Sequence, residues 1–187
     1  MSMRRTPVPP PASDVVVRLA RAGEHEAVGA LTVAGYDADG YFLRTDGSYD
    51  HEYAAWIGDA ASRAGDSTVL VAVAGEQLVG TVTWCPRGSS FAQLAQQQHQ
   101  GEFRALSVAP DARGRGVGRA LVEACLERAR RAGLTEVLLC SLTEMAPAHR
   151  LYLSMGFVRR PDLDWSPLPG TLLWGFSLAL PPVDVSG

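Results

Sequence analysis

The chain is predicted to form a single α/β domain in which one mixed, twisted sheet is covered by helices on both faces. Three observations lead to this prediction. The chain has 187 residues, of which 47% are hydrophobic and 20% charged, so one domain can bury a substantial core. Apolar runs typical of strands alternate with segments of helical periodicity. A glycine-rich basic loop joins one of these strands directly to one of these helices.

The first half of the chain is expected to supply a strand and two helices. An apolar run over 15–19 predicts the first strand. Apolar residues recur at helical spacing over 27–34, and Gly35 is the expected end of that helix. The stretch 36–49 is rich in Asp, Gly and Tyr and is predicted to be a loop. A second helix is expected to begin near Asp50, with a buried face made of Tyr53, Trp56, Ile57 and Ala60.

The middle of the chain predicts a hairpin and a long loop. The β-rich runs 68–74 and 77–84 are separated by Gly75-Glu76, a good two-residue turn. The Ser- and Gln-rich stretch 86–101 is predicted to be a mobile loop before a strand over 102–108.

The last third predicts two helices and three strands. A helix over 117–131 is expected to end before Gly133, and a buried strand follows over 134–141. Pro147 suits the first turn of a short helix that runs through Ser154. Two closing strands are expected at 157–160 and 171–180, around a loop over 161–170.

The most informative segment is the loop between the strand 102–108 and the helix 117–131. Residues 106–119 read Leu-Ser-Val-Ala-Pro-Asp-Ala-Arg-Gly-Arg-Gly-Val-Gly-Arg. A helix start presents unpaired N–H groups and a positive dipole end, and glycines let a ligand approach that backbone. The segment therefore predicts a pyrophosphate site. It is not a dinucleotide-binding fingerprint, because the third glycine of that pattern would fall at position 119, which is Arg119. It is not a Walker loop, because Arg119-Ala120 stands where that loop needs Lys followed by Ser or Thr.

The pattern Arg113-x-x-Gly116-x-Gly118 after a strand ending in Leu-x-Val resembles the acetyl-CoA motif of the GNAT superfamily of N-acetyltransferases. The resemblance continues upstream in 102–108 (Glu-Phe-Arg-Ala-Leu-Ser-Val) and downstream in 148–157 (Ala-His-Arg-Leu-Tyr-Leu-Ser-Met-Gly-Phe). It implies a mostly antiparallel GNAT-like domain over 13–182 with splayed central strands. Residues 1–12 carry four prolines and no apolar core, and this composition predicts a disordered Pro-rich tail before the domain.

The resemblance implies acetyl-CoA, and hence coenzyme A, as co-substrate. Its diphosphate would lie on the amides of 114–119, and its pantetheine arm would pair with backbone groups of 106–108. A plain glycine-rich turn that only starts a helix is the structural alternative. The implied cofactor-binding residues are Leu106, Ser107, Val108, Arg113, Gly114, Arg115, Gly116, Val117, Gly118 and Arg119.

The resemblance also points to two catalytic residues. Glu102 is expected to act as the general base, directly or through one water, because acetyl transfer needs an unprotonated amine. The alternative is a solvated strand-end carboxylate paired with Arg104; His99 is a weaker candidate base. Tyr152 matches the family's general-acid tyrosine and would protonate the leaving thiolate, whereas the alternative is a core aromatic. Met145 stands where many relatives carry an asparagine that contacts the pantetheine arm.

Composition excludes several other classes of protein. The net charge of −3 argues against nucleic acid as a partner, and no apolar run of 18 residues exists to span a membrane. The cysteines 85, 125 and 140 lack paired spacing, so a reducing cytoplasm is expected. The four histidines show no metal-ligand spacing, so no metal is expected.

The predicted function is therefore direct, acetyl-CoA-dependent transfer of an acetyl group to an amine of a small molecule or protein. The alternative is a non-catalytic acyl-CoA-binding sensor or interaction domain. The number of subunits stays open, with a homodimer among the options because homodimers are frequent in the family. No motif identifies the acceptor. Its pocket is expected to involve the Gln-rich loop, residues 162–165 and the side chains of Tyr36, Tyr41, Tyr49 and His51. Nearby aspartates could attract a cationic amine, or they could serve only as turn and cap residues; these are Asp37, Asp39, Asp46, Asp50 and Asp164.

Overall fold

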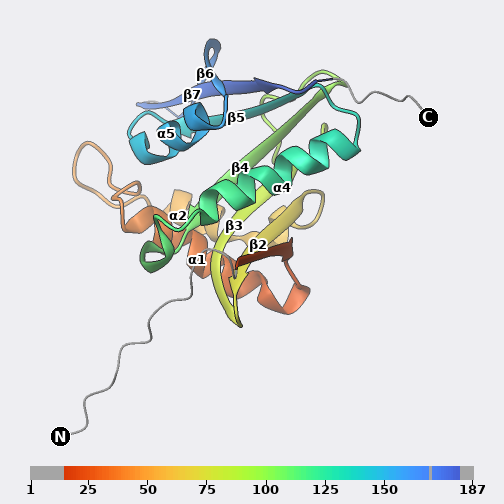
Figure 1. Cartoon of the computed structure of the whole chain (residues 1–187). Coiled ribbons are helices and arrows are strands. Elements are labelled where there is room, and N and C mark those ends of the chain that lie inside the picture. The colour runs from red at the N-terminus through yellow and green to blue at the C-terminus, as the bar shows by residue number, and fades with distance from the viewer. Residues whose placement is uncertain (1–14, 169, 182–187) are drawn as a thin grey trace, which may run out of the picture.

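The computed structural model describes residues 15–168 and 170–181, and these form one seven-stranded sheet with the order β1-β2-β3-β4-β5-β7-β6 (Figure 1). All neighbouring strands are antiparallel except β4 and β5, which are parallel. The predicted mixed, mostly antiparallel sheet is confirmed. The strands are β1 (Val15–Leu19), β2 (Thr68–Ala74), β3 (Gln77–Cys85), β4 (Gln100–Val108), β5 (Glu136–Leu142), β6 (Val158–Leu168) and β7 (Thr171–Ala179).

Helices cover both faces of the sheet, as predicted (Figure 1). Successive side chains of β2 point to opposite faces of the sheet, and both faces are covered. Leu70 and Ala72 pack in the cluster beneath α4, whereas Val69 and Val71 pack on the opposite side with α1 and α3. The helices are α1 (His25–Asp37), α2 (His51–Gly58), α3 (Ala60–Arg63), α4 (Val117–Arg131) and α5 (Ala146–Ser154), with short 3₁₀ turns at Ala22–Glu24 and Pro110–Ala112.

The sheet opens between β4 and β5. Their pairing covers three positions only, from Gln100 opposite Glu136 to Glu102 opposite Leu138. Beyond Glu102 the two strands diverge, and Figure 1 shows them close together near the end of α4 and far apart toward α5 and α2. The predicted splay is confirmed, and it leaves one side of β4 without a strand partner from residue 103 onward.

A bulge in β4 lies just beyond its pairing with β5. Two steps along β3, from Thr83 to Thr81, oppose three steps along β4, from Arg104 to Ser107. Ala105, inside the bulge, has a φ of +51°, a left-handed conformation that is rare for alanine. The extra residue shifts the side-chain alternation, so Arg104 and Ala105 both face the α1–α2 side while Leu106 packs toward α4.

Two helix predictions are corrected. Gly35 does not end α1, which continues to Asp37; instead a Cβ at Gly35 would lie 2.1 Å from Oγ of Ser107, so this glycine lets α1 approach β4. The expected second helix is two helices, because Asp59 leaves the helical conformation and its side chain accepts the N–H of Ser62 as an N-cap. Trp56 is 46% exposed rather than buried.

The predicted loop over 161–170 is also wrong. β6 continues through this stretch to Leu168, with irregular register against β7. Asp164 stabilises the irregularity, since its carboxylate accepts the N–H of Gly175 at 2.9 Å and pairs with Arg159 at 2.5 Å. Pro161 is tolerated because β6 lies at the edge of the sheet. The other elements lie within two residues of their predicted ends, and Gly133 follows α4 with a φ of +69°.

The tail predicted over 1–12 and the domain ends predicted at 13 and 182 lie outside the described residues, so these boundaries stay predictions.

Candidate active site

A cavity of about 390 Å³ lies where β4 leaves β5, between the end of α1, the start of α4 and α5. Nine of the ten residues predicted to bind a cofactor line it; Arg115 does not. The lining residues are Gly35, Tyr36, Asp39, Tyr41, Leu106, Ser107, Val108, Ala112, Arg113, Gly114, Gly116, Val117, Gly118, Arg119, Met145, Pro147, Ala148 and Leu151.

The glycine-rich loop leaves the start of α4 open to this cavity. Gly114 and Gly116 have φ values of +74° and +78°, which favour glycine, and Gly116 is the N-cap of α4. A Cβ placed on either residue would meet no atom within 4 Å. The first N–H groups of α4 have no partner within the helix and carry the positive end of its dipole. The backbone of the loop is therefore accessible to an anionic group.

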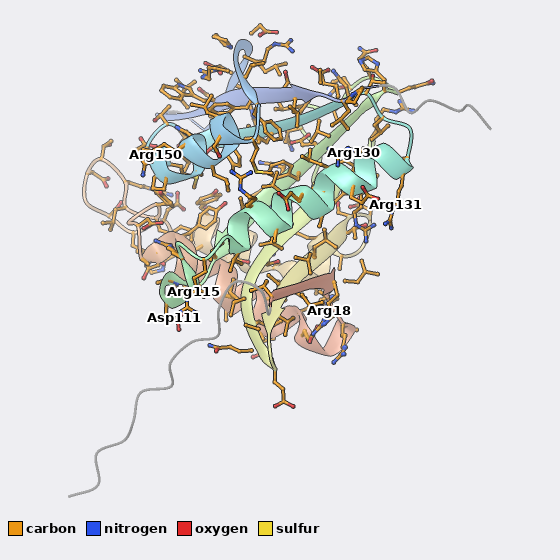
Figure 2. All side chains as sticks on the ribbon, viewed as in Figure 1. Arg18, Asp111, Arg115, Arg130, Arg131 and Arg150 are labelled. Carbon is orange, nitrogen blue, oxygen red and sulfur yellow. The ribbon has the colours of Figure 1, made fainter. Side chains whose placement is uncertain are left out.

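The arginines of the loop have different surroundings. Arg113 is held by the protein itself, with one Nη 2.7 Å from the Asp39 carboxylate and the other donating to the Gly35 carbonyl at 2.8 Å. Arg119 donates to Oγ of Ser154 at 2.8 Å, which joins α4 to the end of α5 at the cavity wall. Figure 2 shows Arg115 at the outer end of the loop, close to Asp111 in this view.

A second, smaller cavity of about 40 Å³ lies on the α2 side of the gap between the strands. It shares Tyr36 and Met145 with the large cavity, so these two side chains separate the two spaces. Burial raises the pKa of Tyr36 to about 12, and the nearby Arg104 and Arg63 partly oppose this rise. The lining residues of the small cavity are Tyr36, Tyr53, Ile57, Arg104, Ala105, Cys140, Ser141, Leu142, Met145 and Leu173.

Glu102 lies in β4 at the last position where β4 pairs with β5, and its side chain is fully buried. Its Oε2 accepts the backbone N–H groups of Gln93, Leu94 and Ala95 at 2.8, 2.7 and 3.2 Å. Its Oε1 has no hydrogen-bond partner among the described residues and lies 3.8 Å from Nε of Arg104. The ion pair with Arg104 is present, but the carboxylate is buried rather than solvated, and it does not line either cavity.

Tyr152 lies on α5 and is buried, 4% exposed, in a cluster of rings that includes Phe103, Phe157 and Phe176. Burial raises the pKa of its phenol, and the neighbouring Tyr36 adds to the rise, so the hydroxyl stays protonated at neutral pH. Its ring packs as a core aromatic and lines neither cavity, and its protonated phenol can donate a hydrogen bond or a proton.

A buried chain of polar groups beside the small cavity was missed by the sequence analysis. Nε2 of His149 lies 3.2 Å from Oγ of Ser141, and that hydroxyl contacts Sδ of Met145 at 3.3 Å. Burial lowers the pKa of His149, so its imidazole is neutral near pH 7. The eight-residue separation of His149 and Ser141 gave no signal, because the contact depends on how α5 packs against β5.

The residues expected around the acceptor are only partly brought together. Tyr36 lines both cavities and Tyr41 lines the large one, whereas Tyr49 and His51 line neither. The indole N–H of Trp165 is buried without a hydrogen-bond acceptor among the described residues and faces the Cys140 thiol.

The aspartates expected to attract a cation are mostly engaged within the protein. Asp39 pairs with Arg113, Asp50 with Arg44 and Asp164 with Arg159, while Asp46 accepts from Ser48. Asp50 also caps α2 by accepting the N–H of Tyr53. These contacts favour turn, cap and pairing roles over attraction of a cation.

Burial disfavours the thiolate form of all three cysteines, which makes them poor nucleophiles. Burial raises the pKa of Cys85 to about 12 and also raises those of Cys125 and Cys140. Within 15–168 and 170–181, no three His, Cys, Asp or Glu side chains gather as metal ligands would. Over the same residues, no helix is both long and apolar enough to cross a bilayer.

The splayed parallel pair, the bulged β4 and the open helix start beside it define an α/β domain of acyltransferase type. A model of the acetyltransferase (GNAT) family matches residues 33–157, more than half of the chain, and the chain belongs to this family.

Among curated proteins, the chain is similar to N-acetyltransferase 8B of Rattus norvegicus, 39% identical over 99 residues that cover 51% of this chain and 43% of that protein. It is also similar to mycothiol acetyltransferase of Geodermatophilus obscurus, 42% identical over 66 residues that cover 35% of this chain and 21% of that protein. The matches thus span less than half the length of these relatives.

Solved structures share the fold at low sequence identity. The yncA protein of Salmonella typhimurium, solved with its cofactor acetyl-CoA, superposes with a TM-score of 0.61 at 18% identity, covering 91% of this chain and 96% of that one. The ribosomal-protein-alanine N-acetyltransferase of Brucella melitensis gives a TM-score of 0.62 at 22% identity, covering 88% and 99%.

Proposed function

We propose that this chain is an acetyl-CoA-dependent N-acetyltransferase that moves an acetyl group directly to an amine of a small molecule or peptide. The observation that carries this proposal is the large cavity, which joins an open helix start to the unpaired side of β4. Family membership and the names of the relatives support it.

The residues present suit acetyl-CoA. Backbone amides of 114–119 would hold the diphosphate, because the helix start supplies N–H donors and the glycines leave them accessible. The unpaired edge of β4 at Leu106, Ser107 and Val108 would hydrogen-bond the amide-bearing arm, as a neighbouring strand would. Acetyl-CoA supplies an activated acyl group whose leaving thiolate needs a proton.

We assign Tyr152 as the donor of that proton. The phenol is buried, so its hydrogen bond to a developing thiolate would be strong in a medium of low dielectric constant. The raised pKa keeps the phenol protonated at neutral pH, so its hydrogen is present as a donor when the C–S bond breaks. Its packing against Phe103 and Phe157 fixes the ring in one orientation.

We propose Glu102 as the general base, acting through Oε1 and one water. This oxygen accepts no hydrogen bond from the described residues, whereas Oε2 is committed to the loop amides. The Ser141–His149 pair is a second candidate, because Ser141 lines the small cavity and the neutral imidazole behind it can accept a proton.

Calorimetry with acetyl-CoA tests the cavity assignment. Gly118 lies in the first turn of α4, and a Cβ there would already be 3.2 Å from Leu151, so Gly118→Leu should fill the cavity and weaken binding by about tenfold or more. The matched control is Glu123→Leu, on an exposed position of the same helix, which should bind like the natural chain.

Thiol release with a panel of amines then tests transfer. Binding of acetyl-CoA together with amine-dependent thiol release is the expected result. No uptake of acetyl-CoA or coenzyme A at millimolar concentration would overturn the proposal. Binding without release to any amine would instead indicate a sensor domain.

A further inference from the structure

We infer that the acceptor amine carries a carboxylate, and that Arg104 binds it in the small cavity. This inference rests on the proposed function and names the class of acceptor. It starts from the charge of the cavity wall: among its ten lining residues there is one arginine and no aspartate or glutamate. Such a wall favours an anion and disfavours a second cationic group.

Arg104 is oriented toward the cavity by contacts that leave part of its guanidinium available. One Nη donates to the Phe91 carbonyl at 2.9 Å, and the guanidinium lies over the rings of Phe91 and Trp56, 4.8 and 5.7 Å from their centroids. The guanidinium also reaches the Cys140 thiol, which lines the same cavity. A guanidinium fixed on aromatic faces is preorganised for a carboxylate.

The charge of Arg104 is incompletely balanced. Glu102 is the carboxylate nearest to it, but the 3.8 Å between Nε and Oε1 exceeds a hydrogen bond, and the other oxygen of Glu102 already accepts three amides. An incoming carboxylate would therefore accept hydrogen bonds from a guanidinium whose ion-pair partner lies beyond hydrogen-bond distance.

A second buried cation lies behind the same wall. Arg63 is 3% exposed, forms no ion pair with a described carboxylate, and donates to the carbonyl of Ile57, which lines the cavity. Its Nε has no hydrogen-bond partner among the described residues. Arg63 and Arg104 thus bring two guanidinium groups to this region, where Glu102 pairs loosely with Arg104 and Asp59 acts on Arg63 at longer range.

The size and position of the cavity agree with this assignment. About 40 Å³ is several times the roughly 10–15 Å³ that one water needs, so the cavity has room for a carboxylate. Since Tyr36 and Met145 border both cavities, an amine attached close to that carboxylate would lie at the boundary with the large cavity. The acceptors that fit are amino acids or amines with a carboxylate one or two bonds away.

Matched acceptors test the inference. Rates of thiol release are measured for small amino acids, for their carboxamides and for the corresponding amines without the carboxyl group. The natural chain should prefer the carboxylate form by about 10- to 100-fold in kcat/KM. In Arg104→Gln this preference should disappear, whereas Arg104→Lys should keep part of it and Arg87→Gln, an exposed arginine of the loop 86–99, should keep all of it.

Acetyl-CoA binding measured on the same samples separates this inference from the proposed function. If Arg104→Gln binds acetyl-CoA normally, a lost preference reports the acceptor site and not misfolding. Equal rates for the carboxylate and its carboxamide in the natural chain, or a preference that survives Arg104→Gln, would overturn the inference and leave the acetyltransferase assignment intact. If the natural chain does not bind acetyl-CoA, both the proposed function and this inference are overturned.

Discussion

Oε2 of Glu102 lies 2.7 Å from the backbone nitrogen of Leu94. The same oxygen accepts the N–H groups of Gln93 and Ala95, so one fully buried carboxylate holds the loop 86–99 against β4. Because Glu102 is also the last residue of β4 that pairs with β5, the loop is fixed at the point where the sheet opens.

We expect Glu102→Gln to destabilise this loop. The neutral amide accepts hydrogen bonds less strongly than a carboxylate, and its NH₂ group would face the guanidinium of Arg104 or the loop amides. The free energy of unfolding in urea should fall by about 1–3 kcal/mol, and proteolysis within 86–99 should become faster. Glu123→Gln on the exposed side of α4 is the control; equal stability of both variants would contradict the anchoring role.

Turnover of two variants should identify the base. If the proton leaves through Oε1 of Glu102, Glu102→Gln should lower kcat by about 10²-fold or more and keep the affinity for acetyl-CoA. His149→Gln should then stay within about threefold of the natural kcat. The reverse pattern would transfer the role to the Ser141–His149 pair. Measuring at low temperature keeps the less stable Glu102→Gln folded.

Tyr152→Phe should separate binding from chemistry. The ring and its contacts with Phe103, Phe157 and Phe176 remain, and only the hydroxyl is lost. We expect kcat to fall by about 10²–10⁴-fold while calorimetry gives an unchanged Kd for acetyl-CoA. Tyr49→Phe, whose ring contacts Phe42 and His51 and not the α5 ring cluster, should behave like the natural chain. A Tyr152→Phe variant with normal kcat would leave this tyrosine a core residue only.

Stability should decline as the pH falls below about 6.5. Burial lowers the pKa of His149 in the folded chain, so below its ordinary pKa the unfolded chain binds more protons and is favoured. Urea unfolding at pH 7.5 and 5.5 should show the loss, and His149→Gln should reduce the difference between the two pH values. Replacing the exposed His51 by Gln should leave that difference unchanged.

Much of the fold could be predicted because its signals are local. The helix 117–131 follows from its apolar stripe and from Gly133, and the hairpin from Gly75-Glu76. The glycine-rich loop predicted the large cavity for the same reason, since a strand, a glycine turn and a helix start are adjacent in the chain. Gly35 was expected to end α1 because glycine is common at helix ends. Its role instead is to let α1 pack closely against Ser107 of β4, which the neighbouring residues in the sequence do not reveal.

The sequence by itself determined the class of fold, the phosphate-type loop and the family, because these depend on residues close together in the chain. Only the tertiary structure decided which charges face the site. Arg104 lines the small cavity because α1, α2, β5 and β7 close the space around it, and Arg113 is engaged because Asp39, 74 residues away, reaches it. Such pairings depend on the distance between side chains in the folded chain, which their spacing in the sequence does not set.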